Sequence, residues 1–478
     1  MSAQKIPHQR PPKQPGTPPP GKASSQRSTP PVIRKPAKPN GLRWFWFWMG
    51  LTGVAMISAT AGALLAVSLS TTPLMQRQLS PAEAAVFEDD SIATGMNVRL
   101  PELTRPVNIL VLGIKVLSTD LDNPPPETRQ LGYQATVNSF EGLSDTMLLL
   151  RFDPEAKKLS LLSIPRDTRT WIDSYGLRKI NDANVFGGPA LSAKSVSELL
   201  GGVGVDRYVR INVQGVGKLV DALGGVTVYV PHDMKYQDDS QHLYINLKAG
   251  KQHLNGDQAL QLLRFRYDEN GDIGRIQRQQ MLMRALMEQT LNPTTLTRLP
   301  KILGVIQSNL DTNLSVEELL ALVGFAARTN RSNVEMLMVP GRFSGPEEYE
   351  ASYWLPDHQR IATMMAEHFN LGIGTPVAND PASLGVAIQD STGRASAVEA
   401  LMNALHEDGY QNVYVDQPWQ EPLSVTRIVA QQGDLASAES IRQALGVGEV
   451  RIESTGSLRS DITVQLGQDW LQKTPPSQ

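Results

Sequence analysis

The middle of the chain alternates between apolar runs and runs with apolar residues at helical spacing. The unbroken run VNILVLG predicts a strand buried on both faces, and further strand-like segments follow it. The predicted strands are Val107–Gly113, Thr146–Phe152, Leu159–Ile164, Tyr208–Ile211, Val226–Val230 and Val334–Val339. The predicted helices are Leu191–Leu200, Gly215–Leu223, Gly256–Leu263, Ile276–Gln289, Val316–Arg328 and Asp357–Phe369. Strands interleaved with helices predict an α/β domain over residues 106–372, with a central mixed sheet covered on both faces.

The pattern restarts after a turn-rich linker at residues 373–381. Strand-like segments VAIQD, NVYV, SVTRIVA, VRIES and DITVQLG alternate with helical segments at Ala395–Glu407 and Leu435–Leu445. This order predicts a second, small α/β domain over residues 382–470. No complete catalytic set stands out within it.

The first part of the chain changes abruptly in charge. Residues 1–43 hold nine Lys or Arg and no acid among many prolines, which predicts a disordered tail. Residues 44–76 hold no charged residue and open with WFWFW, so a transmembrane helix is predicted over 44–70, followed by a linker over 71–105. A cleaved signal peptide is the competing interpretation, but the basic region is too long for one. The positive-inside rule then predicts a single-pass protein of the cytoplasmic (inner) membrane, with a cytoplasmic N-terminus and extracytoplasmic, periplasmic domains.

Composition excludes several classes of chemistry. The chain has no cysteine, so disulfides, catalytic thiols and thiolate zinc sites are absent. Its seven histidines show no HExxH spacing. The net charge of −3 does not by itself point to a polyanionic partner, so any basic site must be local. The predicted location outside the membrane excludes nucleic acid as an ordinary partner.

The densest group of arginines lies in LRFRYDENGDIGRIQRQQMLMR, residues 263–284. Alternation with apolar residues predicts an extended backbone that places Arg264 and Arg266 on one face. GDIG then predicts a turn, and Arg275 and Arg278 share a face near the start of the next helix. Arginine forks and free N–H groups at a helix start both suit phosphate oxygens. The alternative is a solvated basic face whose arginines pair with nearby acids.

Three further polar clusters lie at predicted strand ends. LSDT precedes a strand, where Asp145 could cap the strand or bind a hard metal ion. IPRDT follows a strand, where open α/β sheets tend to bind ligands, and it carries Arg166 and Asp167. KINDANVFGG carries Lys179, Asn181 and Asn184, although a plain loop leading into a helix would also explain it. For an arginine-rich domain tethered outside the membrane, a phosphorylated lipid in that membrane is the natural ligand.

In order, the motifs VNILVLG, LSDTMLLLRFDP, LSIPRDT, KINDANVFGG, LVDALGGVTVYVP and HLNGDQALQLLRFRYDENGDIGRIQRQQ resemble the LytR–CpsA–Psr family. The C-terminal domain is similar to the LytR C-terminal module of many members. The resemblance implies an α/β/α fold and a phosphotransferase dependent on Mg²⁺ (or Mn²⁺). Such an enzyme moves a glycopolymer phosphate from an undecaprenyl-diphosphate carrier to a cell-wall acceptor, usually peptidoglycan, and holds the lipid tail in an apolar pocket.

Carried over residue by residue, the resemblance implies a diphosphate clamp and a metal site. The implied diphosphate-binding residues are Arg166, Lys179, Arg264, Arg266, Arg275 and Gln279. Asp145 would hold the metal, and Asp221 and Asp272 would orient arginines. The implied catalytic residues are Arg166, Asp167 and Asp145, and either acid could take the proton of the attacking hydroxyl.

Two positions depart from the family pattern, and both fall at the metal site. The family usually has a second acidic metal ligand after the first strand, where this chain has Lys115, and an arginine where this chain has Leu143. Asp120 or Asp122 could supply the missing carboxylate, the metal could be bound more weakly, or Lys115 could partly replace the cation. The alternative functions are therefore a non-catalytic envelope anchor that binds polyprenyl lipid or glycan, or a pyrophosphate hydrolase.

Overall fold

A computed structural model describes residues 78–88, 90–94, 101–115, 140–238, 243–265, 271–290, 292–345, 347–372, 380–457 and 459–473. The predicted tail and transmembrane helix lie outside these ranges, as do Asp120, Asp122 and Arg266. Among the helices within them, none combines the length and the apolar character needed to cross a bilayer.

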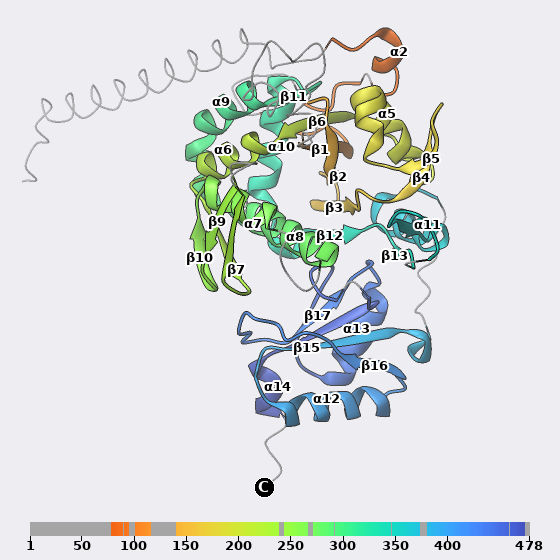
Figure 1. Ribbon diagram of the computed structural model, residues 1–478, viewed down its shortest axis with the longest axis vertical. Coiled ribbons are helices and arrows are strands. Elements are labelled where there is room, and N and C mark those ends of the chain that lie inside the picture. The colour runs from red at the N-terminus through yellow and green to blue at the C-terminus, as the bar shows by residue number, and fades with distance from the viewer. Residues whose placement is uncertain are drawn as a thin grey trace, which may run out of the picture. The chain divides into compact units, whose positions relative to one another are not determined.

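A six-stranded sheet forms the centre of the large domain (Figure 1). Its strands are β1 (Val107–Lys115), β2 (Leu143–Asp153), β3 (Lys158–Ile164), β6 (Arg207–Asn212), β11 (Leu310–Thr312) and β12 (Val334–Met338). Their order is β11-β6-β1-β2-β3-β12. β2 runs antiparallel to β1 and β3, whereas β6 is parallel to β1 and β12 is parallel to β3. The predicted α/β class with a central mixed sheet is confirmed.

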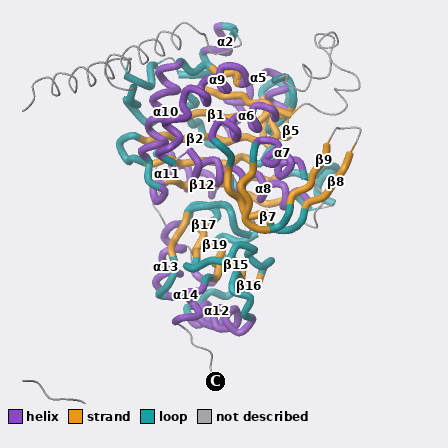
Figure 2. Tube along the Cα trace, turned by 90° about the vertical axis from the view of Figure 1, so that its left-hand side faces the viewer, coloured by secondary structure: helices purple, strands orange, loops and turns teal. Residues whose placement is uncertain are grey.

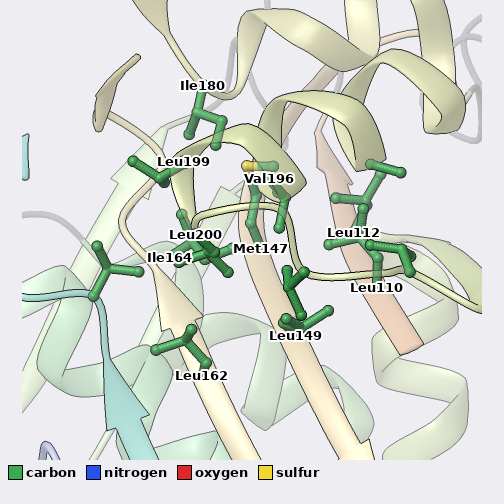
Figure 3. Packing of buried hydrophobic residues seen from close by; sticks show 14 of the residues in the cluster. Leu110, Leu112, Met147, Leu149, Leu162, Ile164, Ile180, Val196, Leu199 and Leu200 are labelled. Atoms are coloured by element: carbon green, nitrogen blue, oxygen red, sulfur yellow. The ribbon is translucent and has the colours of Figure 1, made fainter. Parts of the chain in front are cut away.

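Side chains that alternate along the strands are buried on opposite faces of this sheet. On one face, Leu112, Leu149 and Leu162 pack in a cluster with residues of α5 (Asp182–Leu199) and α11 (His358–Phe369) (Figure 3). On the other face, a cluster that includes Ile109 and Leu161 contains residues of α10 (Val316–Arg328), with residues of α8 (Gly271–Thr290) packed against it. Each fully buried leucine of this kind contributes about 1.5–3 kcal/mol. Helices therefore cover both faces of the sheet.

A group of elements between β6 and α8 forms its own apolar cluster. It comprises α6 (Val213–Leu223), β7 (Val226–Val230), β8 (Met234–Asp238), β9 (Leu243–Leu247), β10 (Gly250–Leu254) and α7 (Gly256–Arg264). β7 pairs with β10, and β8 pairs with β9. Figure 2 shows β8 and β9 side by side. The predicted strand at 226–230 thus exists but belongs to a separate two-stranded sheet. A 3₁₀ helix (Pro293–Arg298) and α9 (Leu299–Asn309) lead from α8 to β11.

Two short hairpin-like pairs were not apparent from the apolar pattern. β4 (Arg169–Ile172) pairs with β5 (Gly176–Lys179), and β13 (Gly341–Phe343) pairs with β14 (Trp354–Pro356). Strands of three or four residues are too short to show a clear period of two. Both pairs lie close to the candidate site described below.

Three helix boundaries differ from the predictions and move residues of interest. α5 begins at Asp182 rather than Leu191, because a break at Gly187 and Gly188 interrupts its periodicity. α8 begins at Gly271, so GDIG is its first turn instead of a separate turn. α7 continues through Arg264, so the extended backbone predicted for this residue is wrong. A cation in the last turn favours the helix because it faces the negative end of the helix dipole.

The predicted linker contains the short helix α2 (Pro81–Ala84). It is more than a spacer, because Phe87 lies in the core with its ring 5.2 Å from that of Tyr208, and Ile92 is fully buried. The described part of the linker therefore packs as part of the large domain.

The C-terminal domain has a five-stranded sheet in the order β16-β15-β19-β17-β18. The strands are β15 (Gly385–Asp390), β16 (Asn412–Val415), β17 (Arg427–Ala430), β18 (Glu449–Arg451) and β19 (Ile462–Leu466). The helices are α12 (Ala395–Glu407), α13 (Leu435–Leu445) and α14 (Gln468–Lys473). A small α/β domain was predicted, and α12 and α13 have the predicted bounds.

Residues 452–454 of the C-terminal domain contact the large domain. The Met336 N–H of edge strand β12 donates to the Ile452 carbonyl at 2.8 Å. Gln280 of α8 donates through Nε2 to Ser454 Oγ at 2.8 Å, and Arg284 Nη1 lies 3.7 Å from Glu453 Oε2. This segment thus bonds to both the edge of the central sheet and the helix that covers it.

Candidate functional site

Asp145 sits in a β-bulge of strand β2. Gly113 pairs with Thr146 and Ile114 pairs with Ser144, so Asp145 is the extra residue without a partner on β1. The two strands approach closely here, since a Cβ added at Gly113 would lie 3.0 Å from Thr146 Cβ. A bulge redirects the side chain of its extra residue. Asp145 is therefore part of the strand, rather than a cap before it, and its carboxylate is aimed by the bulge.

Arg166 follows β3 and binds acids on both sides. Its Nη1 donates to Asp145 Oδ1 at 2.6 Å, and its Nε donates to Asp167 Oδ2 at 3.3 Å. The other Asp167 oxygen, Oδ1, accepts from Lys179 Nζ at 2.7 Å. The four side chains form a row of alternating charge, and their exposed fractions lie between 18% and 29%. The sequence neighbours Arg166 and Asp167 thus form an ion pair that is one link in this larger row.

The KINDAN segment holds this row together through its main chain. The Asn181 N–H donates to the Arg166 carbonyl at 3.3 Å, and the Asn181 carbonyl accepts from the Ser144 N–H at 3.5 Å. The Ile180 N–H donates to the Thr168 carbonyl at 2.9 Å. Residues next to Asp145 and Asp167 are thus tied to the same strand end, which fixes the two acids relative to Arg166.

Asn184 and Arg210 anchor the start of β2 from the interior, and no sequence motif indicated a role for Arg210. The Asn184 side chain donates to the carbonyls of Phe140 and Gly142 at 2.9 and 2.7 Å. Arg210 donates to the Phe140 carbonyl at 3.1 Å and, through Nε, to Asp311 Oδ2 at 2.6 Å. Arg210 is only 2% exposed, so its charge is paired inside the protein.

A pocket opens over the row of charges. Residues from β2, β3 and the following loop, α8, β13 and β14 line it: Asp145, Thr146, Met147, Ser163, Ile164, Pro165, Arg166, Asp167, Gln279, Phe343 and Trp354. Three members of the row, Asp145, Arg166 and Asp167, therefore lie with Gln279 of α8 on one concave surface. The remaining lining is largely apolar.

The arginines predicted from residues 263–284 take different places. Arg264 ends α7 and is not among the described residues that line the pocket. Arg275 and Asp272 lie in the first turns of α8, in a part of the helix where side chains are outside the described structure. Arg278 is buried and donates through Nη2 to the Phe265 carbonyl at 2.7 Å, so it joins the start of α8 to the end of α7.

Asp221 of α6 accepts from the Gly256 N–H at 2.8 Å. This bond ties Asp221 to the first residue of α7, the helix that ends in Arg264. The bond therefore links Asp221 to the helix that carries Arg264.

Further charges surround the row. Burial raises the pKa of Asp182 above its ordinary value; the positive charges of Arg178 and Lys179 act against this rise, and the Asp167 carboxylate adds to it. Lys179 Nζ lies 5.6 Å from the centre of the Tyr353 ring, and Arg169 Cζ lies 4.9 Å from that of Tyr349. Aromatic rings thus hold the cations at the rim.

The described residues contain no cluster of three or more His, Asp or Glu side chains able to hold a metal ion by themselves. Asp145 contacts its described neighbours through Oδ1. Mg²⁺ commonly uses only one or two protein carboxylates and completes its shell with water and substrate phosphates. The donor chemistry at Asp145 therefore fits a cation shared with a phosphorylated ligand. Lys115 ends β1 opposite Leu143, at the same end of the sheet.

Among relatives with assigned names, the chain resembles two polyisoprenyl-teichoic acid–peptidoglycan teichoic acid transferases. It is 30% identical to TagU of Oceanobacillus iheyensis over 318 residues, which cover 65% of this chain and 90% of that protein. It is 31% identical to TagV of Bacillus subtilis over 242 residues, covering 48% and 61% of the two chains. The crystal structure of B. subtilis TagV is 27% identical, with a TM-score of 0.45, and covers 56% of this chain and 99% of that one.

Two family models match the chain in succession. The model of the LytR_cpsA_psr family matches residues 75–370, more than half of the chain. The model described as LytR cell envelope-related transcriptional attenuator matches residues 383–470. The chain therefore belongs to the LytR–CpsA–Psr family and carries a LytR C-terminal domain.

Proposed function

We propose that this chain is a membrane-anchored phosphotransferase that moves a glycopolymer phosphate from an undecaprenyl-diphosphate carrier to peptidoglycan, outside the cytoplasmic membrane. Family membership and the names of the relatives TagU and TagV support transfer of a glycopolymer to peptidoglycan. The observation that carries the proposal is the row Asp145–Arg166–Asp167–Lys179 at a pocket on the end of the sheet.

This row is suited to binding a diphosphate by exchange of partners. Arg166 presents a planar fork of donors and Lys179 a compact ammonium, and both prefer phosphate or carboxylate oxygens. Their present partners are Asp145 and Asp167, so a diphosphate would take over some of these bonds. Arg264, Arg266, Arg275 and Gln279 complete the proposed clamp, with Asp221 and Asp272 supporting the arginines.

Asp145 is the proposed ligand of Mg²⁺ (or Mn²⁺), with Asp120 or Asp122 as candidates for a second ligand. When bound, the ion would neutralise the negative charge that develops on the diphosphate. Lys115 ends β1 at the same end of the sheet, and we propose that it substitutes for part of this neutralisation.

In the proposed step, a hydroxyl oxygen of the acceptor attacks the phosphorus next to the glycan. A new phosphorus–oxygen bond forms, and the bond from that phosphorus to the bridging oxygen breaks. Undecaprenyl phosphate leaves with the bridging oxygen, and Arg166 and Lys179 stabilise its charge. Asp145 or Asp167 accepts the hydroxyl proton. Both acids also pair with cations, Asp167 with Arg166 and Lys179 and Asp145 with Arg166.

The experiment uses the full chain in detergent with an undecaprenyl-diphosphate-linked, radiolabelled glycan and peptidoglycan. Label that becomes attached to peptidoglycan, together with undecaprenyl phosphate identified by mass spectrometry, is the expected result. Addition of EDTA should stop both, and added Mg²⁺ should restore them.

The same assay separates the two alternatives. Release of glycan phosphate into solution without attachment would indicate a pyrophosphate hydrolase. Lipid that binds but never turns over would indicate a non-catalytic anchor. Absence of lipid binding would overturn all three functions.

A further inference from the structure

The β4–β5 hairpin lies beside α5 (Figure 1), and its last residue, Lys179, belongs to the row of charges. The hairpin and the start of α5 carry several exposed apolar side chains. Trp171 is 55% exposed, Tyr175 42%, Leu177 51% and Val185 45%. In the described part of the chain, the other large apolar side chains with comparable exposure are spread over β9, β16 and two loop or helix ends: Tyr244, Val415, Val425 and Leu435. Concentrated exposure of this kind marks a surface that binds something apolar.

The hairpin is well anchored, so this exposure does not come from loose packing. Ile172 is fully buried and Thr170 is largely buried, which fixes the opposite face of β4. The Tyr175 ring stacks on Phe186 of α5, with centroids 4.2 Å apart and planes 6° from parallel. Arg178 Cζ lies 5.4 Å from the centre of the same Phe186 ring. The exposed side chains are thus presented by a fixed ribbon.

One face of the β4–β5 hairpin carries apolar side chains near the tip and cationic side chains farther from it. Trp171 is paired with Leu177 in the antiparallel register, and Arg169 is paired with Lys179. Residues paired across the two strands lie on the same face of the hairpin. Residues two apart on one strand also share a face and are about 7 Å apart. The apolar pair therefore lies next to the tip of the hairpin, and the cationic pair lies one step nearer the site, where Lys179 binds Asp167.

The geometry points to the Trp171–Leu177 face of the hairpin as a surface that enters the outer leaflet of an anionic bilayer. Trp and Tyr are favoured at the level of lipid head groups, and Leu and Val are favoured below it. The cations one step back complement anionic lipid phosphates. This inference rests on the proposed function, because it brings the row at Lys179 to the level at which a lipid-linked diphosphate lies. A glycan-binding platform is the competing class, but it offers no role for exposed Leu177 and Val185.

Site-directed spin labelling tests this inference, and the absence of native cysteine makes every introduced thiol unique. Leu177→Cys and Val415→Cys are matched variants, because both residues lie on strands and are 51% and 52% exposed. Each full-length variant is labelled with a nitroxide and placed in nanodiscs that contain phosphatidylglycerol. Collision with oxygen, which concentrates in lipid, is compared with collision with a water-soluble nickel complex.

The expected result is a several-fold lower nickel collision rate and a higher oxygen collision rate for the label at 177 than for the label at 415. Equal accessibility of the two labels would overturn the inference. Shielding of the label at 177 only after soluble peptidoglycan fragments are added would also overturn it, in favour of a glycan platform.

A second measurement keeps this inference separate from the proposed function. The double variant Trp171→Ser with Leu177→Ser should transfer glycan several-fold more slowly from substrate in bilayers and at an unchanged rate from substrate in detergent micelles. Equal slowing in both media would overturn membrane contact as the cause. If the unaltered chain transfers no glycan in either medium, the proposed function fails, while the spin-label result still decides whether the hairpin enters lipid.

Discussion

The guanidinium of Arg166 lies 2.6 Å, Nη1 to Oδ1, from the carboxylate of Asp145, the extra residue of the bulge in β2. This contact joins the proposed phosphate ligand directly to the proposed metal ligand. Without substrate, each group neutralises the other. In the proposed function, a metal ion would bind the carboxylate and a substrate phosphate would bind the guanidinium, so that neither charge would be left unpaired in the pocket.

Replacing Arg166 should remove most of the activity. Arg166→Ala deletes the fork that would stabilise charge on the departing phosphate, and loss of one such donor commonly lowers kcat by about 100-fold to 1,000-fold. Arg166→Lys should recover only part of this loss, because lysine lacks the planar fork. The measurement is the initial rate of glycan transfer, with thermal unfolding as a check on the fold.

Arg342→Ala is the matched control for this variant. Arg342 also forms ion pairs with a carboxylate, that of Glu348, but its side chain is 64% exposed and does not line the pocket. It should retain the full rate. Full activity of folded Arg166→Ala would remove Arg166 from the proposed mechanism.

Asn184→Ala should weaken both the fold and the activity. It leaves the buried Gly142 carbonyl without its side-chain donor, while the Phe140 carbonyl keeps the donor from Arg210, and an unsatisfied buried group costs about 1–3 kcal/mol. Because these carbonyls lie just before β2, the rate should also fall as Asp145 loses its fixed position. Urea unfolding and the transfer rate measure the two effects.

Asn333→Ala provides a comparison for Asn184. Its Nδ2 also donates to a main-chain carbonyl, that of Lys157, but at an exposed position. The free energy of unfolding and the rate should both stay close to those of the unaltered chain. Equal losses in the two variants would indicate that burial of the Asn184 bonds is unimportant.

Acid should destabilise the protein through Glu335 of β12. Burial by itself would raise the pKa of this carboxyl, but the hydrogen bond from His368 and the charges of His368 and Lys158 outweigh it and hold the pKa below the ordinary 4.5. A carboxyl with a lowered folded-state pKa contributes stability above pH 4.5, and this contribution is lost as the pH falls through the folded-state pKa. Stability should therefore decrease with falling pH in the range below 4.5.

Glu335→Gln should reduce the loss of stability with falling pH below 4.5. It should also lower the free energy of unfolding near neutral pH by about 1–3 kcal/mol, because the buried partners of the carboxylate lose a charge-assisted bond. Chemical unfolding at a series of pH values measures the slope. Glu347→Gln, which removes an exposed carboxylate, is the control. An unchanged slope in Glu335→Gln would show that another group governs acid stability.

The bond between Gln280 and Ser454 should couple the two domains energetically. Gln280→Ala and Ser454→Ala each remove one partner of a buried hydrogen bond, and the double variant should cost less than the sum of the single ones by about 0.5–1.5 kcal/mol. A double-mutant cycle on the free energy of unfolding measures this difference. Additive losses would mean that the bond contributes no coupling.

The secondary structure of strongly apolar segments could be predicted from the sequence. The positions of the polar site residues could be predicted only in part. β1, β2 and β3 were predicted because core strands expose almost nothing polar, and α10, α12 and α13 because their apolar residues repeat at helical spacing. Asp145 was placed before its strand, since a bulge depends on pairing with β1 and leaves no local signal. Arg264 was read as extended because two alternating residues resembled a strand, whereas the capping box at Asn255 had already committed this segment to a helix.

Contacts between distant residues were beyond sequence reasoning. Arg210 and Asp311 are 101 residues apart, and only the adjacency of β6 and β11 brings their charges together. The row from Asp145 to Lys179 could be predicted in part. Its members were identified individually by motif, but the bond from Lys179 to Asp167 depends on the short β4–β5 hairpin, which had no clear pattern.

The bond from the Met336 N–H to the Ile452 carbonyl has a consequence for solubility. Unpaired main-chain groups along the outer strand of a sheet can recruit strands from other molecules and start aggregation. On the β12 side, the C-terminal domain occupies such a group and places charged Glu453 beside it. A chain shortened before residue 380 would uncover this edge of β12, so we expect the C-terminal domain to limit self-association of the large domain as well as to contact its helix α8.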